Sequence, residues 1–151
     1  MVARSDLVAT GEFGKSAMTT GYSRTPLAKK LGYADGVSVY VVGVPASVKA
    51  EISTDAKPKF VAKPSKDQPA AHVFAINAKV LEAELKKLRQ LLAPNGMVWV
   101  SWPKKAAKVE TDITEDTIRA IALPMGYVDV KVCAVDETWS GLKLVIRKAL
   151  R

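Results

Sequence analysis

The clearest periodic segment of the chain is the leucine-rich stretch at residues 79–92. Leu81, Leu85, Leu88 and Leu92 recur at intervals of three or four residues, and this spacing places them along one face of an α-helix. The basic residues of the same stretch fall on its other faces, where we expect them to be solvated. The pattern therefore predicts an amphipathic helix over 79–92 that packs through its leucines.

Three continuous apolar runs predict buried strands at residues 37–44, 70–77 and 97–102. Strands that are covered on both faces, as in parallel sheets, typically have such uninterrupted apolar character. Asn95-Gly96 predicts a turn into the third run. Pro103, which lacks an N–H group, predicts its end.

The helix signals elsewhere are short but specific. Before LAKKL, Thr25-Pro26 predicts a helix with Thr25 as its N-cap and Pro26 at its first position, and Gly32 lies just past its end. Thr114, followed by acidic residues in the first turn, predicts a second helix that ends near Leu123.

The end of the chain predicts a β-hairpin. Residues 128–135 and 142–146 have strand character, and the DETWSG segment between them contains a turn signal. Residues 45–68 stay undecided, because they suit a short helix at 46–53 and an edge strand at 59–62 without requiring either.

This order of elements predicts an α/β fold of the three-layer, Rossmann-like type. Its sheet is expected to be mostly parallel, with helices on both faces and a C-terminal antiparallel hairpin. Residues 1–21 mix small polar residues and isolated charges without hydrophobic periodicity. We therefore predict a flexible extension at 1–21 and a single domain over 22–151.

From the 70–77 strand onward, the leucine helix, the PNG turn into a strand and the closing hairpin resemble the latter half of the fold of S-adenosylmethionine-dependent methyltransferases. The resemblance implies that the last strand is inserted beside the 97–102 strand. The 128–135 strand would then run parallel to 97–102, and both would end at the same edge of the sheet.

We expect a binding site at this edge, because open α/β sheets bind ligands at the carboxyl ends of their strands. Aromatic residues would supply a wall, lysines a positive charge and carboxylates hydrogen-bond acceptors. The alternative, in which the tryptophans pack and a carboxylate pairs with a lysine, stays open. The candidate residues are Gly43, Trp102, Lys104, Lys105, Asp136, Glu137, Trp139 and Ser140.

The resemblance also implies a cofactor site that this chain matches poorly. Such methyltransferases hold S-adenosylmethionine on a Gly-rich turn after the first strand, with a carboxylate after the second strand for the ribose. Here the turn reads VVGVPASV, which keeps only Gly43, and no acidic residue stands at the second place. We therefore predict no catalytic residue and no cofactor. A turn filled by Val44 and Pro45 would further exclude S-adenosylmethionine.

Composition adds general limits. The 151 residues carry a formal net charge of +8, which makes an acidic partner conceivable. The single cysteine, Cys133, excludes an internal disulfide and favours a cytoplasmic setting, and no membrane association is expected. His72 is the single histidine, and no cluster of residues has metal-ligand spacing, so we predict no metal site.

Three long stretches are similar to a small family of uncharacterised bacterial proteins. They are GYSRTPLAKKLG at 21–32, PNGMVWVSWPKKAAKVETDITEDTIR at 94–119 and VDVKVCAVDETWSGLKLVIRKALR at 128–151. The similarity extends over most of residues 18–151, and the chain departs from the family between 43 and 77. The resemblance implies a bacterial protein and assigns it no reaction.

The sequence therefore favours a non-enzymatic binding or regulatory domain with a degenerate methyltransferase-like fold. Its ligand would be an anionic small molecule or a protein partner at the carboxyl edge of the sheet. One alternative is a divergent S-adenosylmethionine-dependent methyltransferase. The other is a nucleic-acid-binding protein, although the basic residues of the 79–92 helix lack interleaved aromatic residues.

Overall fold

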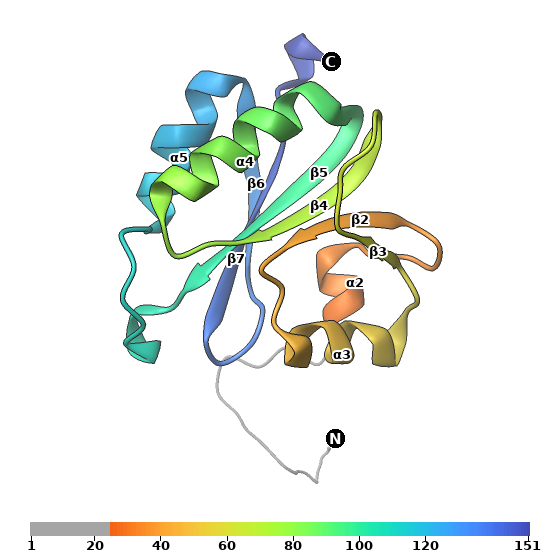
Figure 1. Ribbon diagram of the computed structural model, residues 1–151, viewed down its shortest axis with the longest axis vertical. Coiled ribbons are helices and arrows are strands. Elements are labelled where there is room, and N and C mark those ends of the chain that lie inside the picture. Colours follow the sequence, from red (N-terminus) through yellow and green to blue (C-terminus); the bar gives the residue numbers. More distant parts are fainter. Residues whose placement is uncertain (1–24) are drawn as a thin grey trace, which may run out of the picture.

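The computed structural model describes residues 25–151, which form one six-stranded sheet with helices on both faces (Figure 1). The strand order is β3-β2-β4-β5-β7-β6. The parallel strands are β2 (Ser38–Val42), β3 (Lys59–Val61), β4 (Gln68–Phe74) and β5 (Leu92–Pro103). The α/β, Rossmann-like fold class is confirmed.

The last strand has the place that the resemblance to methyltransferases implies. β7 (Trp139–Ile146) lies between β5 and β6 (Tyr127–Ala134) and is antiparallel to both. β6 therefore runs parallel to β5, and their carboxyl ends share one edge of the sheet. The extension predicted for residues 1–21 lies outside the described residues.

The helices divide between the two faces of the sheet. Figure 1 shows α4 (Ala78–Leu91) and α5 (Glu115–Ala122) over one face, and α2 (Leu27–Leu31) and α3 (Ala46–Asp55) over the other. Short 3₁₀ turns, η1 (Lys105–Ala107), η2 (Leu123–Met125) and η3 (Lys148–Leu150), complete the described elements.

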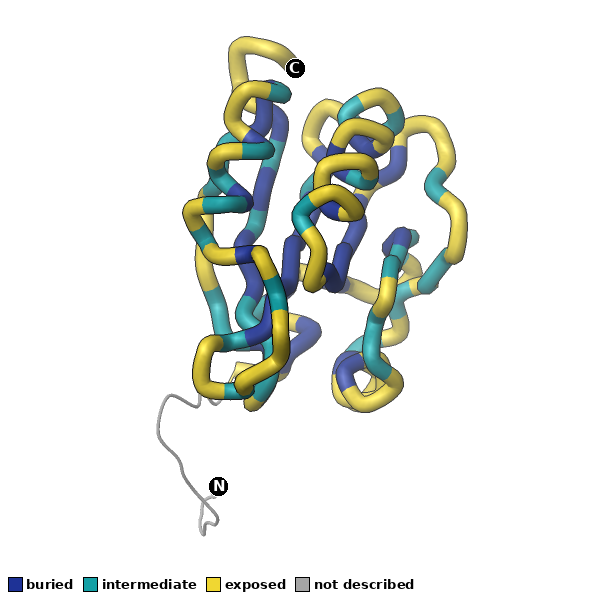
Figure 2. Tube along the Cα trace, turned by 60° about the vertical axis from the view of Figure 1, so that its left-hand side comes forward, coloured by how far each residue is buried: buried dark blue, intermediate teal, exposed yellow. Residues whose placement is uncertain are grey.

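Two buried clusters reflect the alternation of side chains along the strands. On β4, Ala71 and Val73 pack with the α4 leucines in one cluster, whereas Ala70 and Phe74 pack with Trp99 in the other. The leucine stripe of α4 is confirmed, since its inward-facing leucines are fully buried. Figure 2 shows buried residues along the strands and exposed residues on the outer sides of the helices.

Segment 45–68, which the sequence leaves undecided, contains both the helix and the edge strand that its sequence allows. The helix at 46–53 is α3, and the edge strand at 59–62 is β3, which within residues 25–151 pairs with β2 alone. Residues 62–67 then lead directly into β4.

Three predicted boundaries differ from the structure. β7 begins at Trp139, so the hairpin turn is shorter than DETWSG, because Trp139 and Ser140 pair with β5. β5 begins at Leu92, and an irregularity in its pairing with β4 precedes Met97, at the predicted Asn95-Gly96 turn. At the start of α2, the N-cap is Pro26, with no side-chain hydrogen bond to the cap.

Candidate functional site

The carboxyl ends of β2 and β4 mark the point where the connections of this sheet diverge. β2 and β4 are neighbours, but the chain leaves β2 through α3 on one face and β4 through α4 on the other. Ligands of open α/β sheets bind where adjacent connections diverge in this way. We call this position, at the ends of β2 and β4, the switch point.

The turn after β2 brings backbone donors to the switch point. Gly43 is exposed and has a left-handed φ of 65°, and an added Cβ atom would lie 3.0 Å from the carbonyl oxygen of Phe74. Only glycine fits this combination of backbone conformation and close approach without strain. The turn is thus held tightly against the end of β4.

The N-terminus of α3 follows this turn and is not capped by a side chain. The N–H of Val48 bonds to the carbonyl of Pro45, whereas Ala46 and Ser47 at the exposed start of the helix have no acceptor within it. The side chain of Val44 is partly buried and packs against the core cluster that contains Phe74. These two N–H groups, at the positive end of the helix dipole, suit a carboxylate.

The hairpin lies at the same edge, as the sequence predicts. The Lys104 N–H donates to the carbonyl of Thr138 at 2.7 Å, which fastens the end of β5 to the turn between β6 and β7. The ring of Trp139 lies edge-on to that of Phe74, with centroids 5.2 Å apart. Through Phe74, Trp139 therefore reaches the switch point from the hairpin side.

The two tryptophans do not form one wall. Trp102 is buried in the cluster beneath α4 and α5, whereas Trp139 belongs to the cluster on the opposite face. Trp102 pairs with Ser140 and Pro103 pairs with Trp139, and successive residues of a strand point to opposite faces. Of these two tryptophans, Trp139 is the one that lies beside the switch point.

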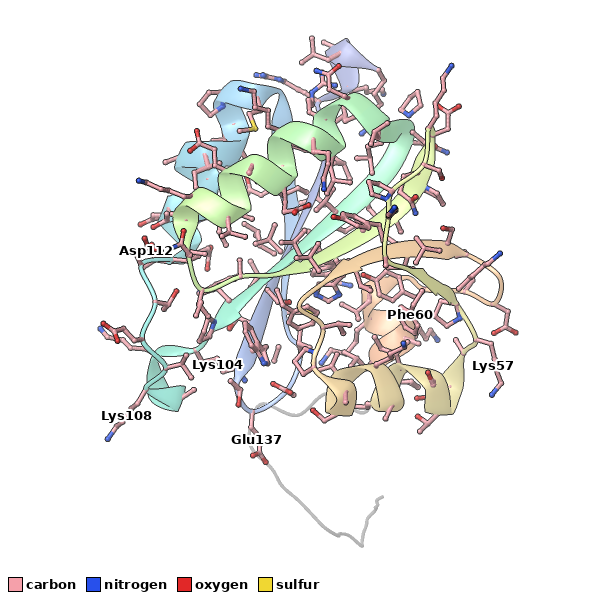
Figure 3. The ribbon with its side chains drawn as sticks, in the orientation of Figure 1. Lys57, Phe60, Lys104, Lys108, Asp112 and Glu137 are labelled. Carbon is pink, nitrogen blue, oxygen red and sulfur yellow. The ribbon has the colours of Figure 1, made fainter. Side chains whose placement is uncertain are left out.

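The remaining candidates have different surroundings. The carboxylate of Asp136 accepts the N–H groups of Thr138 and Trp139, both at 2.8 Å, and so shapes the hairpin turn. Glu137 is exposed at the tip of the hairpin and projects away from the sheet (Figure 3). Ser140 is half-buried within β7, and Lys105 is exposed in η1.

Both signs of charge gather at the carboxyl edge. Figure 3 shows Lys104, Lys108, Asp112 and Glu137 around this end of the sheet. Desolvation raises the pKa of the Glu51 carboxyl, which is exposed on α3, and the negative charge of Asp136 raises it further, whereas the charge of Lys30 lowers it. The edge is therefore suited to a ligand that carries positive and negative groups together.

The structure also reveals a buried polar chain beneath the switch point. His72 lies between Tyr33, whose Oη is 3.1 Å from Nδ1, and Ser101, whose Oγ is 2.7 Å from Nε2. Burial lowers the pKa of His72 to about 3, so the ring is neutral. Sequence reasoning missed this chain because its members are 39 and 29 residues apart. Three polar residues in three separate buried segments form no pattern that can be recognised locally in the sequence.

A concavity lies away from the switch point, beside α2 and the C-terminal end of α3. It has a volume of about 460 Å³ and includes Tyr33, Lys29 and Asp55 in its lining.

Cys133 is half-buried, and burial raises the pKa of its thiol. Within residues 25–151, no group of three or more metal-ligating side chains is assembled. No helix in the same range has the length and apolar character needed to cross a membrane.

The fold is that of the Rossmann-like methyltransferases. An S-adenosylmethionine-dependent methyltransferase from Aquifex aeolicus is similar with a TM-score of 0.56 and 14% identity, covering 80% of this chain and 87% of that one. The 1,6-didemethyltoxoflavin-N1-methyltransferase of Burkholderia thailandensis, solved with S-adenosylhomocysteine, has a TM-score of 0.57 and 12% identity, covering 81% and 77%. Aeropyrum pernix fibrillarin, solved with S-adenosylmethionine, has a TM-score of 0.55 and 10% identity, covering 83% and 70%.

These neighbours correct one prediction. The sequence leaves the enzyme question open and leans towards a non-enzymatic domain, and this leaning is contradicted, because several structures that share the fold are methyltransferases. At such low identity the likeness itself establishes the fold. No protein-family model matches the sequence and no curated protein is similar to it, so membership of the uncharacterised bacterial family stays a prediction.

Proposed function

We propose that the chain is a divergent S-adenosylmethionine-dependent methyltransferase whose cofactor binds at the switch point. The observation that carries the proposal is the turn from β2 into α3, in a sheet whose strand order places β7 between β5 and β6. Exposed Gly43 lies against Phe74, and the uncapped N–H groups of Ala46 and Ser47 follow it. The fold shared with cofactor-bound methyltransferases supports this reading.

The residues at the switch point fit one half of the cofactor well. The N–H groups of Ala46 and Ser47 would bind the carboxylate of its amino-acid part. The neighbouring carboxylates of Glu51 and Asp136 would favour its ammonium and sulfonium charges, and the rings of Phe74 and Trp139 would border it. When bound, the cofactor supplies a methyl group to an acceptor nucleophile, and its sulfur keeps the bonding electron pair as S-adenosylhomocysteine forms.

The segment of the chain that would bind the ribose of the cofactor differs from the family pattern. Ala62 and Lys63 follow β3, where a carboxylate would bind the ribose hydroxyls. The short loop 62–67 leads straight to β4. We therefore expect the cofactor to be held mainly through its amino-acid part.

The acceptor side of the proposed site is the end of β5. Lys104 and exposed Lys105 would contact an anionic part of the acceptor, and Ile76, which is 49% exposed after β4, would contact an apolar part. The hydrogen bonds from Thr111 Oγ1 and the Asp112 N–H to the Ile76 carbonyl hold this surface in place.

Isothermal titration of the full chain with S-adenosylhomocysteine tests the proposal. We expect saturable binding, and we expect Ala46→Pro to weaken it about tenfold, because loss of one hydrogen bond to a charged group costs about 1.5 kcal/mol or more. Proline is tolerated at the first position of a helix, and Pro45 already has the extended ψ of 144° that a residue before proline requires. Ala46→Ser keeps the N–H and is the matched control. Absence of binding by the wild-type chain, or equal affinity of both variants, would refute the proposal.

A further inference from the structure

The ring of His72 is fixed at both of its nitrogen atoms. Tyr33, from the segment between α2 and β2, holds Nδ1, and Ser101, from β5, holds Nε2. His72 and Ser101 are at most 1% exposed and Tyr33 is 3% exposed. A buried ring bonded on both sides cannot rotate without leaving buried polar atoms unpaired, which is costly.

The fixed imidazole in turn supports Phe74. The two rings are stacked, with centroids 4.2 Å apart and an angle of 22° between their planes. Phe74 is the last residue of β4 and is two residues from His72, so both side chains lie on the same face of the sheet. The position of the Phe74 ring therefore depends on the position of the imidazole.

Phe74 contacts both sides of the switch point. A Cβ atom added at Gly43 would lie 3.0 Å from the carbonyl oxygen of Phe74. The ring of Phe74 meets the ring of Trp139 edge-on. One residue thus contacts the turn that we assign to the cofactor and the aromatic residue at the hairpin.

We infer that Tyr33, His72 and Ser101 form a positioning device that sets Phe74, and through it Trp139 and the Gly43 turn, in the geometry that binds the cofactor. This inference rests on the proposed function. The three residues act through Phe74 and touch no ligand themselves. Their role goes beyond filling the core, because the same buried volume could be filled by apolar side chains without any polar chain.

The test removes the two hydrogen bonds and keeps the imidazole. The double variant Tyr33→Phe/Ser101→Ala frees both ring nitrogens, and Tyr127→Phe is the matched control. Tyr127 is also fully buried, and its hydroxyl donates to the Leu85 carbonyl at 2.6 Å on the opposite face of the sheet. We expect both changes to lower stability, and we expect the first alone to affect Phe74.

Two readouts are measured well below the melting temperature. We expect the double variant to raise the Kd for S-adenosylhomocysteine about fivefold or more, the lower end of typical coupling between sites, while Tyr127→Phe leaves it unchanged. We also expect the indole N–H resonance of Trp139 in the ligand-free protein to shift in the double variant and to stay in place in Tyr127→Phe. The single variant Tyr33→Phe should show a smaller shift, and it replaces the double variant if that protein does not fold.

The outcomes separate this inference from the proposed function. The positioning role would be overturned if the Tyr33→Phe/Ser101→Ala variant, or Tyr33→Phe in its place, kept both the wild-type Kd for S-adenosylhomocysteine and the wild-type position of the Trp139 resonance. If the wild-type chain does not bind S-adenosylhomocysteine, the proposed function fails. The Trp139 resonance then still decides whether the polar chain positions Phe74.

Discussion

The indole N–H of Trp99 donates to the carbonyl oxygen of Leu31 at 2.8 Å, across 68 residues of sequence. Leu31 is the last residue of α2, and its carbonyl is one of those that a helix end leaves without an intrahelical partner. Trp99 lies in the middle of β5, and both residues are fully buried. This bond ties the short first helix to the centre of the sheet, beside the segment that carries Tyr33.

Replacing Trp99 should therefore cost more than its lost volume. We expect Trp99→Phe to destabilise the fold by about 1–2 kcal/mol more than Trp102→Phe, because it leaves the Leu31 carbonyl buried and unpaired. Trp102 is also buried, and its indole makes no side-chain hydrogen bond to residues 25–151. Denaturant unfolding of both variants measures the difference, and equal losses would contradict it.

The buried His72 predicts a loss of stability in acid. Its pKa is about 3 in the folded chain against 6.5 for an ordinary histidine, so below pH 6.5 the unfolded chain binds a proton that the folded chain does not. Stability is then complete above pH 6.5 and falls as the pH falls towards 3. The slope between pH 6 and pH 4 approaches about 1.4 kcal/mol per unit.

Denaturant unfolding at pH 7, 6, 5 and 4 checks this slope. The control is His72→Gln, which retains hydrogen-bonding groups without titrating in this range. Carboxylates titrate in both proteins, so the difference between their curves isolates the histidine. Parallel curves would show that protonation of His72 does not contribute.

Local patterns were sufficient to predict most of the fold. The leucine spacing of α4 and the apolar runs of β2, β4 and β5 follow directly from burial on one face or on both. The capping residue Thr114 accepts the N–H of Thr117, as a helix start requires. The place of β7 came from a resemblance in the order of elements, because strand order has no local pattern.

The site was harder to predict, because it depends on which face of the sheet each side chain occupies. The sequence predicts that Trp102 and Trp139 lie together at one edge of the sheet. The register of β5 and β7 instead places them on opposite faces. Gly43 could be identified from its position after an apolar run. Phe74 could not be singled out, since its importance comes from contacts with Gly43, His72 and Trp139, which are distant in sequence.

Substitutions at two glycines with left-handed conformations distinguish the effect of backbone strain on stability from an effect on ligand binding. Gly36 has a φ of 79° with nothing near an added Cβ atom, whereas Gly43 has a φ of 65° and meets the Phe74 carbonyl. We expect Gly36→Ala to cost about 1 kcal/mol through backbone strain alone, and Gly43→Ala to cost more. Only Gly43→Ala should also weaken S-adenosylhomocysteine binding. Thermal unfolding and titration measure the two effects, and equal affinities would place the cofactor elsewhere.

Trp139 should report cofactor binding directly. Trp99 and Trp102 are buried, whereas Trp139 is partly exposed and contacts Phe74 beside the Gly43 turn. A ligand at the switch point would change the surroundings of this indole and leave the other two in place. Titration with S-adenosylhomocysteine should therefore change the tryptophan fluorescence of the wild-type chain and of Trp102→Phe, but not that of Trp139→Phe. Phenylalanine keeps an aromatic ring against Phe74, so calorimetric binding by Trp139→Phe should persist without the optical signal. A fluorescence change that survives in Trp139→Phe would place the ligand away from the hairpin side of the switch point.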